Sequence, residues 1–314
     1  MSVYVVTGGA GFIGSNIARR LLDLGEEIRV VDDLSTGRKE NLNTLPRGVY
    51  FHEGSICDRS LLHKAFAGVD FVLHQAARPS VQRSVENPAE TNRVNVDGTL
   101  AVLTAARDEG VKRVVYASSS SVYGDLPELP KRESAIPRPK SPYAVSKLAG
   151  EYYCRVFGDV FGLQTVSLRY FNVYGPRQDP GSQYAAVIPI FIRCLLEGKP
   201  PRVFGDGEQS RDFTYVDDVV EANLLAARAP DAGGAVLNIG CGARHTLNEL
   251  LRHLQRLTGK SATPEYAANR AGDVRDSQAD ITRAREVIRY QPRVSFEEGL
   301  RRTVEWYQNG PLGR

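Results

Sequence analysis

Residues 4–14 read YVVTGGAGFIG and lead directly into SNIARRLL at residues 15–22. The apolar start predicts a strand, the glycines a tight turn, and the pattern that follows a helix. Gly9, Gly11 and Gly14 have the G-x-G-x-x-G spacing, and Gly8 gives an overlapping G-x-x-G-x-x-G. Such a turn lets the backbone approach a pyrophosphate at the positive end of a helix. We therefore predict a dinucleotide phosphate site in this stretch.

An acidic residue lies where a dinucleotide site needs one. Asp32 follows Gly14 by eighteen residues, at the end of the apolar run 28–31. A carboxylate at this place accepts hydrogen bonds from the hydroxyls of the adenosine ribose. The same negative charge repels a 2′-phosphate, so the sequence predicts NAD rather than NADP as the cofactor.

The composition excludes several classes of protein. The 314 residues include 40 basic and 37 acidic side chains, a net charge of +3, which argues against a nucleic-acid partner. Residues 1–4 show no signal-peptide pattern and no apolar run approaches about 18 residues, so we expect a cytoplasmic protein without a membrane partner. The four cysteines are scattered and the five histidines include no metal-ligand pair, so we expect no disulfide and no metal site.

Strand and helix patterns alternate through the first half of the chain, which is typical of an α/β fold with a doubly wound, Rossmann-like parallel sheet. We predict strands at 3–7, 27–32, 49–52, 70–74, 113–117 and 165–169, and helices at 12–24, 59–66, 91–109 and 142–157.

Prolines and glycines become frequent after about residue 170, which predicts a smaller α/β domain over the carboxyl edge of the sheet. We place the dinucleotide-binding domain at residues 1–170 and the smaller domain at 171–314. A strand and helix pattern at 213–229 predicts that the chain returns to the first domain at about 213–240.

A tyrosine and a lysine form a candidate catalytic pair. Ser141 and Pro142 predict a helix start, which places Tyr143 and Lys147 one turn apart on the same face. A phenol with a pKa near 10 is no base at neutral pH unless cations stabilise the phenolate. Lys147 and a positively charged nicotinamide ring would do so. Serines 118–121 follow a predicted strand, at the edge where such sheets form their sites.

Several ordered motifs resemble those of the extended short-chain dehydrogenase/reductases, and most of all those of the UDP-glucose 4-epimerase family. The motifs are residues 7–14, residues 32–37, the serine run before Val122-Tyr123-Gly124, and residues 141–147, 169–177, 205–218 and 270–274. The resemblance extends over nearly the whole chain.

The resemblance implies an enzyme that uses a tightly held NAD as a transient hydride store and forms a 4-keto sugar. In such an enzyme Tyr143 takes the proton of the sugar 4-hydroxyl. Lys147 lowers the pKa of that tyrosine and holds the nicotinamide ribose, and Ser119 hydrogen-bonds the reacting oxygen. The relatives also imply a homodimer, formed through helices such as 91–109 and 142–157.

The resemblance assigns binding residues by position. For NAD it implies Gly8, Gly11, Phe12, Ile13, Gly14, Asp32, Asp33, Leu34, Ser35, Thr36, Gly37, Ser55, Ile56, Gln75, Ala76, Ala77, Asn95, Tyr143, Lys147 and Tyr170. For a UDP-sugar it implies Ser119, Ser120, Ser121, Tyr143, Asn172, Val187, Arg211, Arg270, Asp273 and Ser277. Arginine side chains suit the diphosphate. Ser55 departs from the family, which usually has an aspartate there for the adenine.

Four positions separate the possible reactions. Ser120 and Ser121 stand where related dehydratases and decarboxylases have an acidic residue. Asp179 stands where uronate 4-epimerases have an arginine, and would repel a sugar carboxylate. Ser277 is small where glucose-restricted members can have tyrosine, which leaves room for an N-acetyl group.

We therefore predict a UDP-hexose 4-epimerase that accepts UDP-glucose, UDP-galactose and their N-acetylated counterparts, UDP-GlcNAc and UDP-GalNAc. The alternatives are a UDP-glucuronate 4-epimerase, a decarboxylase, a dehydratase, an oxidoreductase with net turnover, and a non-enzymatic NAD-binding regulator.

Overall fold

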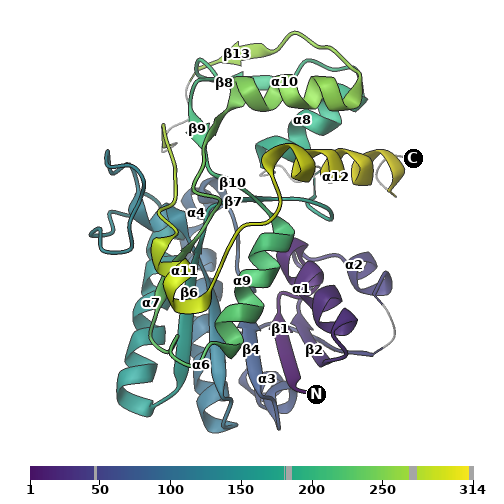
Figure 1. Ribbon diagram of the computed structural model, residues 1–314. Coiled ribbons are helices and arrows are strands. Elements are labelled where there is room, and N and C mark those ends of the chain that lie inside the picture. The colour runs from purple at the N-terminus through teal and green to yellow at the C-terminus, as the bar shows by residue number, and fades with distance from the viewer. Residues whose placement is uncertain (46–47, 180, 182–185, 269–273, 311–314) are drawn as a thin grey trace.

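The computed structural model describes residues 1–45, 48–179, 181, 186–268 and 274–310. A large sheet with helices on both faces makes up the lower part of the molecule in Figure 1, and a smaller lobe lies above it. The predicted α/β fold with a Rossmann-like parallel sheet is confirmed. Among the described helices, none is long and apolar enough to cross a membrane.

The main sheet has seven strands in the order β11-β6-β5-β4-β1-β2-β3, all paired in parallel. The strands are β1 (Val3–Thr7), β2 (Glu27–Asp32), β3 (Val49–Glu53), β4 (Phe71–His74), β5 (Arg113–Ser119), β6 (Gln164–Tyr170) and β11 (Val236–Ile239). From β1 the chain builds outward through β2 and β3, and then crosses to β4 on the other side of β1. The order therefore reverses between β1 and β4, and sites in such sheets form outside the carboxyl ends at that point.

Successive side chains of the central strands pack into two separate cores, because side chains alternate across a sheet. Val6 packs against α1 (Phe12–Asp23) and α9 (Val216–Arg228) on one face. Val5 packs against α3 (Arg59–Phe66), α6 (Gly98–Asp108) and α7 (Pro142–Phe161) on the other face. The sheet is thus buried on both sides, and only its edges are free to form a site.

The smaller lobe combines helices with three short strand pairs (Figure 1). Its helices are α8 (Val187–Leu196), α10 (Leu247–Thr258) and α12 (Phe296–Asn309), and its strand pairs are β7 (Asn172–Tyr174) with β10 (Phe213–Tyr215), β8 (Arg202–Phe204) with β13 (Glu265–Ala267), and β9 (Ser210–Arg211) with β12 (His245–Thr246). Between these segments the chain passes through α9 and β11 of the main layer. The domain boundary at residue 170 stays a prediction.

The helix expected at 91–109 is divided in the structure. α5 (Pro88–Asn92) is followed by a π-helical turn at Arg93–Asp97 and then by α6. Within that turn the Asn95 side chain points inward and hydrogen-bonds the backbone of Arg78 and the Ser146 hydroxyl. A single π-turn in a long helix often marks a functional site. Residue periodicity could not reveal it, because the flanking turns keep a helical pattern.

Candidate active site

A cavity of about 710 Å³ lies outside the carboxyl ends of β1, β2, β4, β5 and β6. Most of the residues that the sequence assigned to NAD line it, namely Gly8, Gly11, Phe12, Ile13, Gly14, Asp32, Asp33, Leu34, Ser35, Thr36, Gly37, Ile56, Gln75, Ala76, Ala77, Tyr143, Lys147 and Tyr170. Ser55 and Asn95 are not among the lining residues. The Ser55 hydroxyl accepts a hydrogen bond from the Cys57 N–H, and Asn95 lies buried behind the wall.

The glycine-rich turn is packed too tightly for larger residues. A Cβ atom at Gly14 would lie 2.2 Å from the carbonyl oxygen of Gly8, and one at Gly8 would lie 2.7 Å from the Ala76 nitrogen. Gly8 also has a φ of 69°. α1 starts at Phe12 without a side-chain cap, so its first N–H groups are available to an anion. This cradle fits the pyrophosphate of a dinucleotide.

Asp32 is oriented by the backbone around it. The residue is 7% exposed, and its carboxylate accepts hydrogen bonds from the N–H groups of Ala10 and Leu34, both at 2.9 Å. Burial raises the pKa of this carboxyl, and the two N–H donors oppose that rise. Each carboxylate oxygen keeps a lone pair for another donor. The side chain therefore fits the ribose hydroxyls of NAD.

Tyr143, Lys147 and Ser119 come together where α7 packs on the end of β5. Ser141 caps α7 by accepting the Ala144 N–H at 3.1 Å, which fixes the first turn. Lys147 Nζ donates to the carbonyl oxygen of Ala117 at 2.7 Å and lies 5.9 Å from the centre of the Tyr143 ring. Lys147 is 4% exposed.

Burial shifts the pKa values of both catalytic candidates. It lowers the pKa of the Lys147 ammonium to about 8. It raises the pKa of the Tyr143 phenol, and the hydrogen bond between Tyr143 and Ser119 opposes that rise. The phenol therefore needs a cation beside it to act as a base near neutral pH, and the Lys147 ammonium is in place to provide one.

A glycine explains how α7 comes so close to the sheet. A Cβ atom at Gly150 would lie 2.2 Å from the hydroxyl oxygen of Tyr116 on β5. This close approach buries Lys147 and places its ammonium at the end of the strand. Gly150 is thus a helix-interior glycine with a packing role.

The serine run turns sharply after β5. Ser119 Oγ accepts the N–H of Ser121 at 3.1 Å, and residues 120–123 form a short 3₁₀ helix. The Ser121 hydroxyl is buried and has no hydrogen-bond partner within the described part of the chain. A buried hydroxyl without a partner is suited to form a hydrogen bond with a ligand.

Among the described residues that the sequence assigned to the substrate, Tyr143 alone lines the cavity. Asn172 pairs with Phe213 between β7 and β10, and β9, which includes Arg211, comes just before β10. Arg211 Nη1 donates to the carbonyl oxygens of Ser210 and Arg275, both at 2.9 Å, and the Ser277 N–H donates to Ser210 at 3.1 Å.

Arg211 and Ser277 are therefore neighbours, and Val187 begins α8 next to the cavity-lining Ala186. Ser120 is partly buried in the 3₁₀ turn. Arg270 and Asp273 lie outside the described residues.

Several lining residues were not predicted for the cofactor, namely Arg38, Arg78, Arg83, Arg177 and Gln178. Arg38, Arg78, Arg177 and Gln178 lie in loops and Arg83 lies on the short helix α4 (Val81–Glu86), where polar residues are usually interpreted as surface residues. Asp179, which the sequence assigned to repelling a uronate, forms an ion pair with Arg38 at 2.7 Å. The repulsion expected for a sugar carboxylate is therefore reduced. In the sequence, only the positions of Arg38 and Arg78, shortly after β2 and β4, indicated that these residues could lie at the cavity.

Fold and cavity together define an NAD-dependent enzyme of the extended short-chain dehydrogenase/reductase class. The chain belongs to the NAD dependent epimerase/dehydratase family, whose model matches residues 4–240. The UDP-glucose 4-epimerase of Mycolicibacterium smegmatis is 42% identical over 309 residues, which are 97% of this chain and 98% of that protein.

Two solved structures superpose closely on the chain. The UDP-glucose 4-epimerase of Thermotoga maritima, determined with UDP-glucose, has a TM-score of 0.93 and 42% identity, covering 98% of each chain. The UDP-N-acetylglucosamine 4-epimerase of Methanobrevibacter ruminantium, in complex with UDP-N-acetylmuramic acid, has a TM-score of 0.93 and 40% identity, again covering 98% of each chain. The resemblance to the UDP-glucose 4-epimerase family is thus confirmed.

Substitution of Gly14 tests the cofactor cradle. We expect Gly14→Ala to weaken NAD binding by about tenfold or more, because the new methyl group forces α1 away from the glycine-rich turn. Titration calorimetry of the NAD-free protein measures the Kd.

The matched control is Gly158→Ala, in the interior of α7, where the nearest atom to the added Cβ is 3.5 Å away. This variant should leave the NAD Kd unchanged and stabilise the fold by up to about 1 kcal/mol. An unchanged Kd in Gly14→Ala would contradict the assignment of the turn.

Proposed function

We propose that the chain is a UDP-hexose 4-epimerase that interconverts UDP-glucose with UDP-galactose and UDP-GlcNAc with UDP-GalNAc through a 4-keto sugar. The observation that carries the proposal is the group of Tyr143, Lys147 and Ser119, in which Tyr143 and Lys147 line a cavity that fits NAD and Ser119 hydrogen-bonds Tyr143. The two similar epimerase structures, one with UDP-glucose and one named for UDP-N-acetylglucosamine, support both substrate pairs.

In this reaction Tyr143 takes the proton of the sugar 4-hydroxyl, and Ser119 hydrogen-bonds the same oxygen. The Lys147 ammonium favours the phenolate form of Tyr143 and stays oriented by its bond to Ala117. Bound NAD supplies the hydride acceptor at C4 and later the hydride donor. The keto sugar is held by its nucleotide while the ring turns, and Tyr143 returns the proton to the oxygen.

The neighbouring residues favour epimerisation over the alternatives. Elimination and decarboxylation need an acid near the sugar, and Ser120 and Ser121 provide only hydroxyls. A UDP-glucuronate 4-epimerase stays the nearest alternative, because the charge of Asp179 is paired with Arg38. Ser277 leaves volume beside the sugar for an N-acetyl group. A non-enzymatic regulator would not need the buried Lys147 ammonium under the tyrosine.

A turnover assay tests the function. Purified protein is incubated with UDP-galactose, UDP-GalNAc or UDP-glucuronate, and the products are resolved by NMR. We expect the first two to give their 4-epimers and the third to stay unchanged. Tyr143→Phe should lose about 10²–10⁴-fold in rate because it lacks the proton acceptor.

Ser277→Tyr distinguishes the two substrate pairs. It should slow UDP-GalNAc turnover by about tenfold or more and spare UDP-galactose, because the ring fills the N-acetyl space. Equal effects on both substrates would show that Ser277 does not set this preference. Turnover of UDP-glucuronate alone would contradict the neutral-hexose assignment.

The pH dependence tests the role of Lys147. Burial lowers the pKa of its ammonium to about 8, and below that pH Tyr143 and Lys147 both hold their protons. The reactive pair of phenolate and ammonium forms when the two groups lose one proton between them, so kcat/KM should rise toward pH 8 and level off above it. In Lys147→Met the residual rate should instead keep rising above pH 8, since the phenol then ionises unaided. A wild-type profile that rises through pH 8–10 would contradict this role.

We also propose that the chain forms a homodimer through α7. Four apolar side chains lie exposed at helical spacing on that helix, namely Val145, Tyr152, Val156 and Val160. Sedimentation velocity should show a dimer, and Val156→Glu should shift it toward the monomer because the charge would be buried in the contact. A monomeric wild-type protein at micromolar concentration would contradict the proposal.

A further inference from the structure

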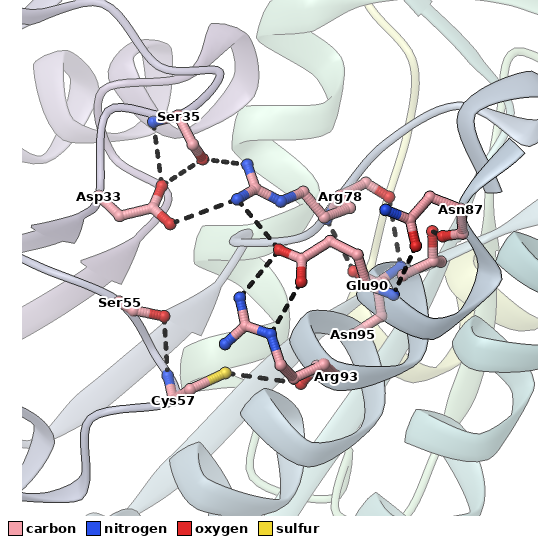
Figure 2. Close-up of polar contacts among 10 residues, drawn as sticks. Asp33, Ser35, Ser55, Cys57, Arg78, Asn87, Glu90, Arg93 and Asn95 are labelled. Carbon is pink, nitrogen blue, oxygen red and sulfur yellow. Dashed lines mark hydrogen bonds and ion pairs between the residues drawn. The ribbon is translucent and has the colours of Figure 1, made fainter.

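A network of charged side chains lies at the cavity wall near Asp32. Figure 2 shows the Arg78 side chain facing Asp33 and Ser35 on one side and Glu90 of α5 on the other. Arg78 Nη2 lies 3.8 Å from Asp33 Oδ2 and 3.4 Å from Glu90 Oε1, and Nη1 donates to the Ser35 hydroxyl. The Arg78 side chain is only 16% exposed.

The sheet order shows what these contacts join. β1 lies between β4 and β2, so the glycine-rich turn after β1 lies between the loop after β4 and the loop after β2. Arg78 belongs to the first loop, and Asp33 and Ser35 belong to the second. All three line the same cavity as Gly11 and Gly14. The guanidinium therefore connects the two loops on either side of the pyrophosphate cradle.

Hydrogen bonds with Asn95 hold the backbone of Arg78 in place. Its N–H donates to Asn95 Oδ1 at 2.7 Å, and Asn95 Nδ2 donates to its carbonyl oxygen at 3.3 Å. Asn95 Nδ2 also donates to the Ser146 hydroxyl at 3.0 Å, on the helix that includes Tyr143 and Lys147. Pro79 and a φ of 93° at Ser80 restrict the following residues. Arg78 thus loses little freedom when its side chain makes these contacts.

Exposure and position distinguish Arg78 from Arg93, the other arginine of the network. Arg93 also binds Glu90, through two hydrogen bonds of 2.8 Å, but it is half exposed and is not among the residues that line the cavity. Arg78 instead acts on the ribose side of the site, where its positive charge lowers the pKa of Asp32 against the effect of burial. The planar guanidinium of arginine presents several N–H donors and can contact Asp33, Ser35 and Glu90 at once. The ammonium of a lysine is a compact point charge without this fixed set of donors.

We propose that Arg78 is a positioning residue that closes the cavity over the bound dinucleotide by tying the loop after β2 to the loop after β4, and so slows NAD dissociation. Release of NAD then requires the two loops to separate, which breaks the contacts of Arg78 with Asp33 and Ser35. The proposal depends on NAD as the cofactor and is independent of which sugar the enzyme epimerises.

NAD exchange tests this proposal without any turnover. Protein loaded with radiolabelled NAD is mixed with excess unlabelled NAD, and the bound label is followed over time. Arg78→Ala should raise the dissociation rate constant by about tenfold or more, because charge-assisted contacts between the loops are lost. Glu90→Gln should raise it less, since Asp33 and Ser35 still hold the guanidinium.

Two further variants separate this role from a general loss of structure. Arg93→Ala removes the other partner of Glu90 outside the cavity and should change the rate constant by less than about twofold. Arg78→Lys keeps the charge and should lie between Arg78→Ala and the unmodified protein; it carries the test if Arg78→Ala does not fold. Unchanged dissociation in the Arg78 variants, or an equal increase in Arg93→Ala, would overturn the proposal.

Discussion

The contact between the first turn of α1 and the end of β1 is the constraint on which the rest of the structure depends. It exists only because Gly8 and Gly14 lack side chains, since a methyl group at Gly14 would overlap the carbonyl oxygen of Gly8. The contact points the free N–H groups of α1 into the cavity and leaves Asp32 of the next strand at its side. The cofactor site therefore follows from the geometry of one turn between a strand and a helix.

The proposed proton transfer depends on a second close approach, between α7 and β5. Gly150 lets the helix touch Tyr116, which buries Lys147 and directs its ammonium to the carbonyl oxygen of Ala117. A buried cation beside a buried phenol is unfavourable for stability but useful for proton transfer, because each group lowers the energy of the ion that the other must form. The Arg78 contacts link the cofactor end of the cavity to the same helix through Asn95 and Ser146.

The sequence predicted most of what depends on local patterns. The six predicted strands and the first helices lie within one or two residues of their expected bounds, and most of the residues that the family resemblance assigned to NAD line one cavity. It did not predict what depends on distant contacts. The π-turn around Asn95 reflects packing against Arg78 and Ser146, and the pairing of Arg38 with Asp179 joins residues 141 positions apart. Such contacts leave no periodic signal in the chain.

In the proposed reaction one site removes a hydride from the sugar C4 and returns it to the opposite face. UDP-galactose that carries deuterium at C4 tests this most directly, with the product analysed by NMR and mass spectrometry. We expect UDP-glucose that retains the deuterium at C4, with no label in the water. Loss of the deuterium to solvent, or hydrogen from the solvent at C4 of the product, would contradict hydride transfer within one site.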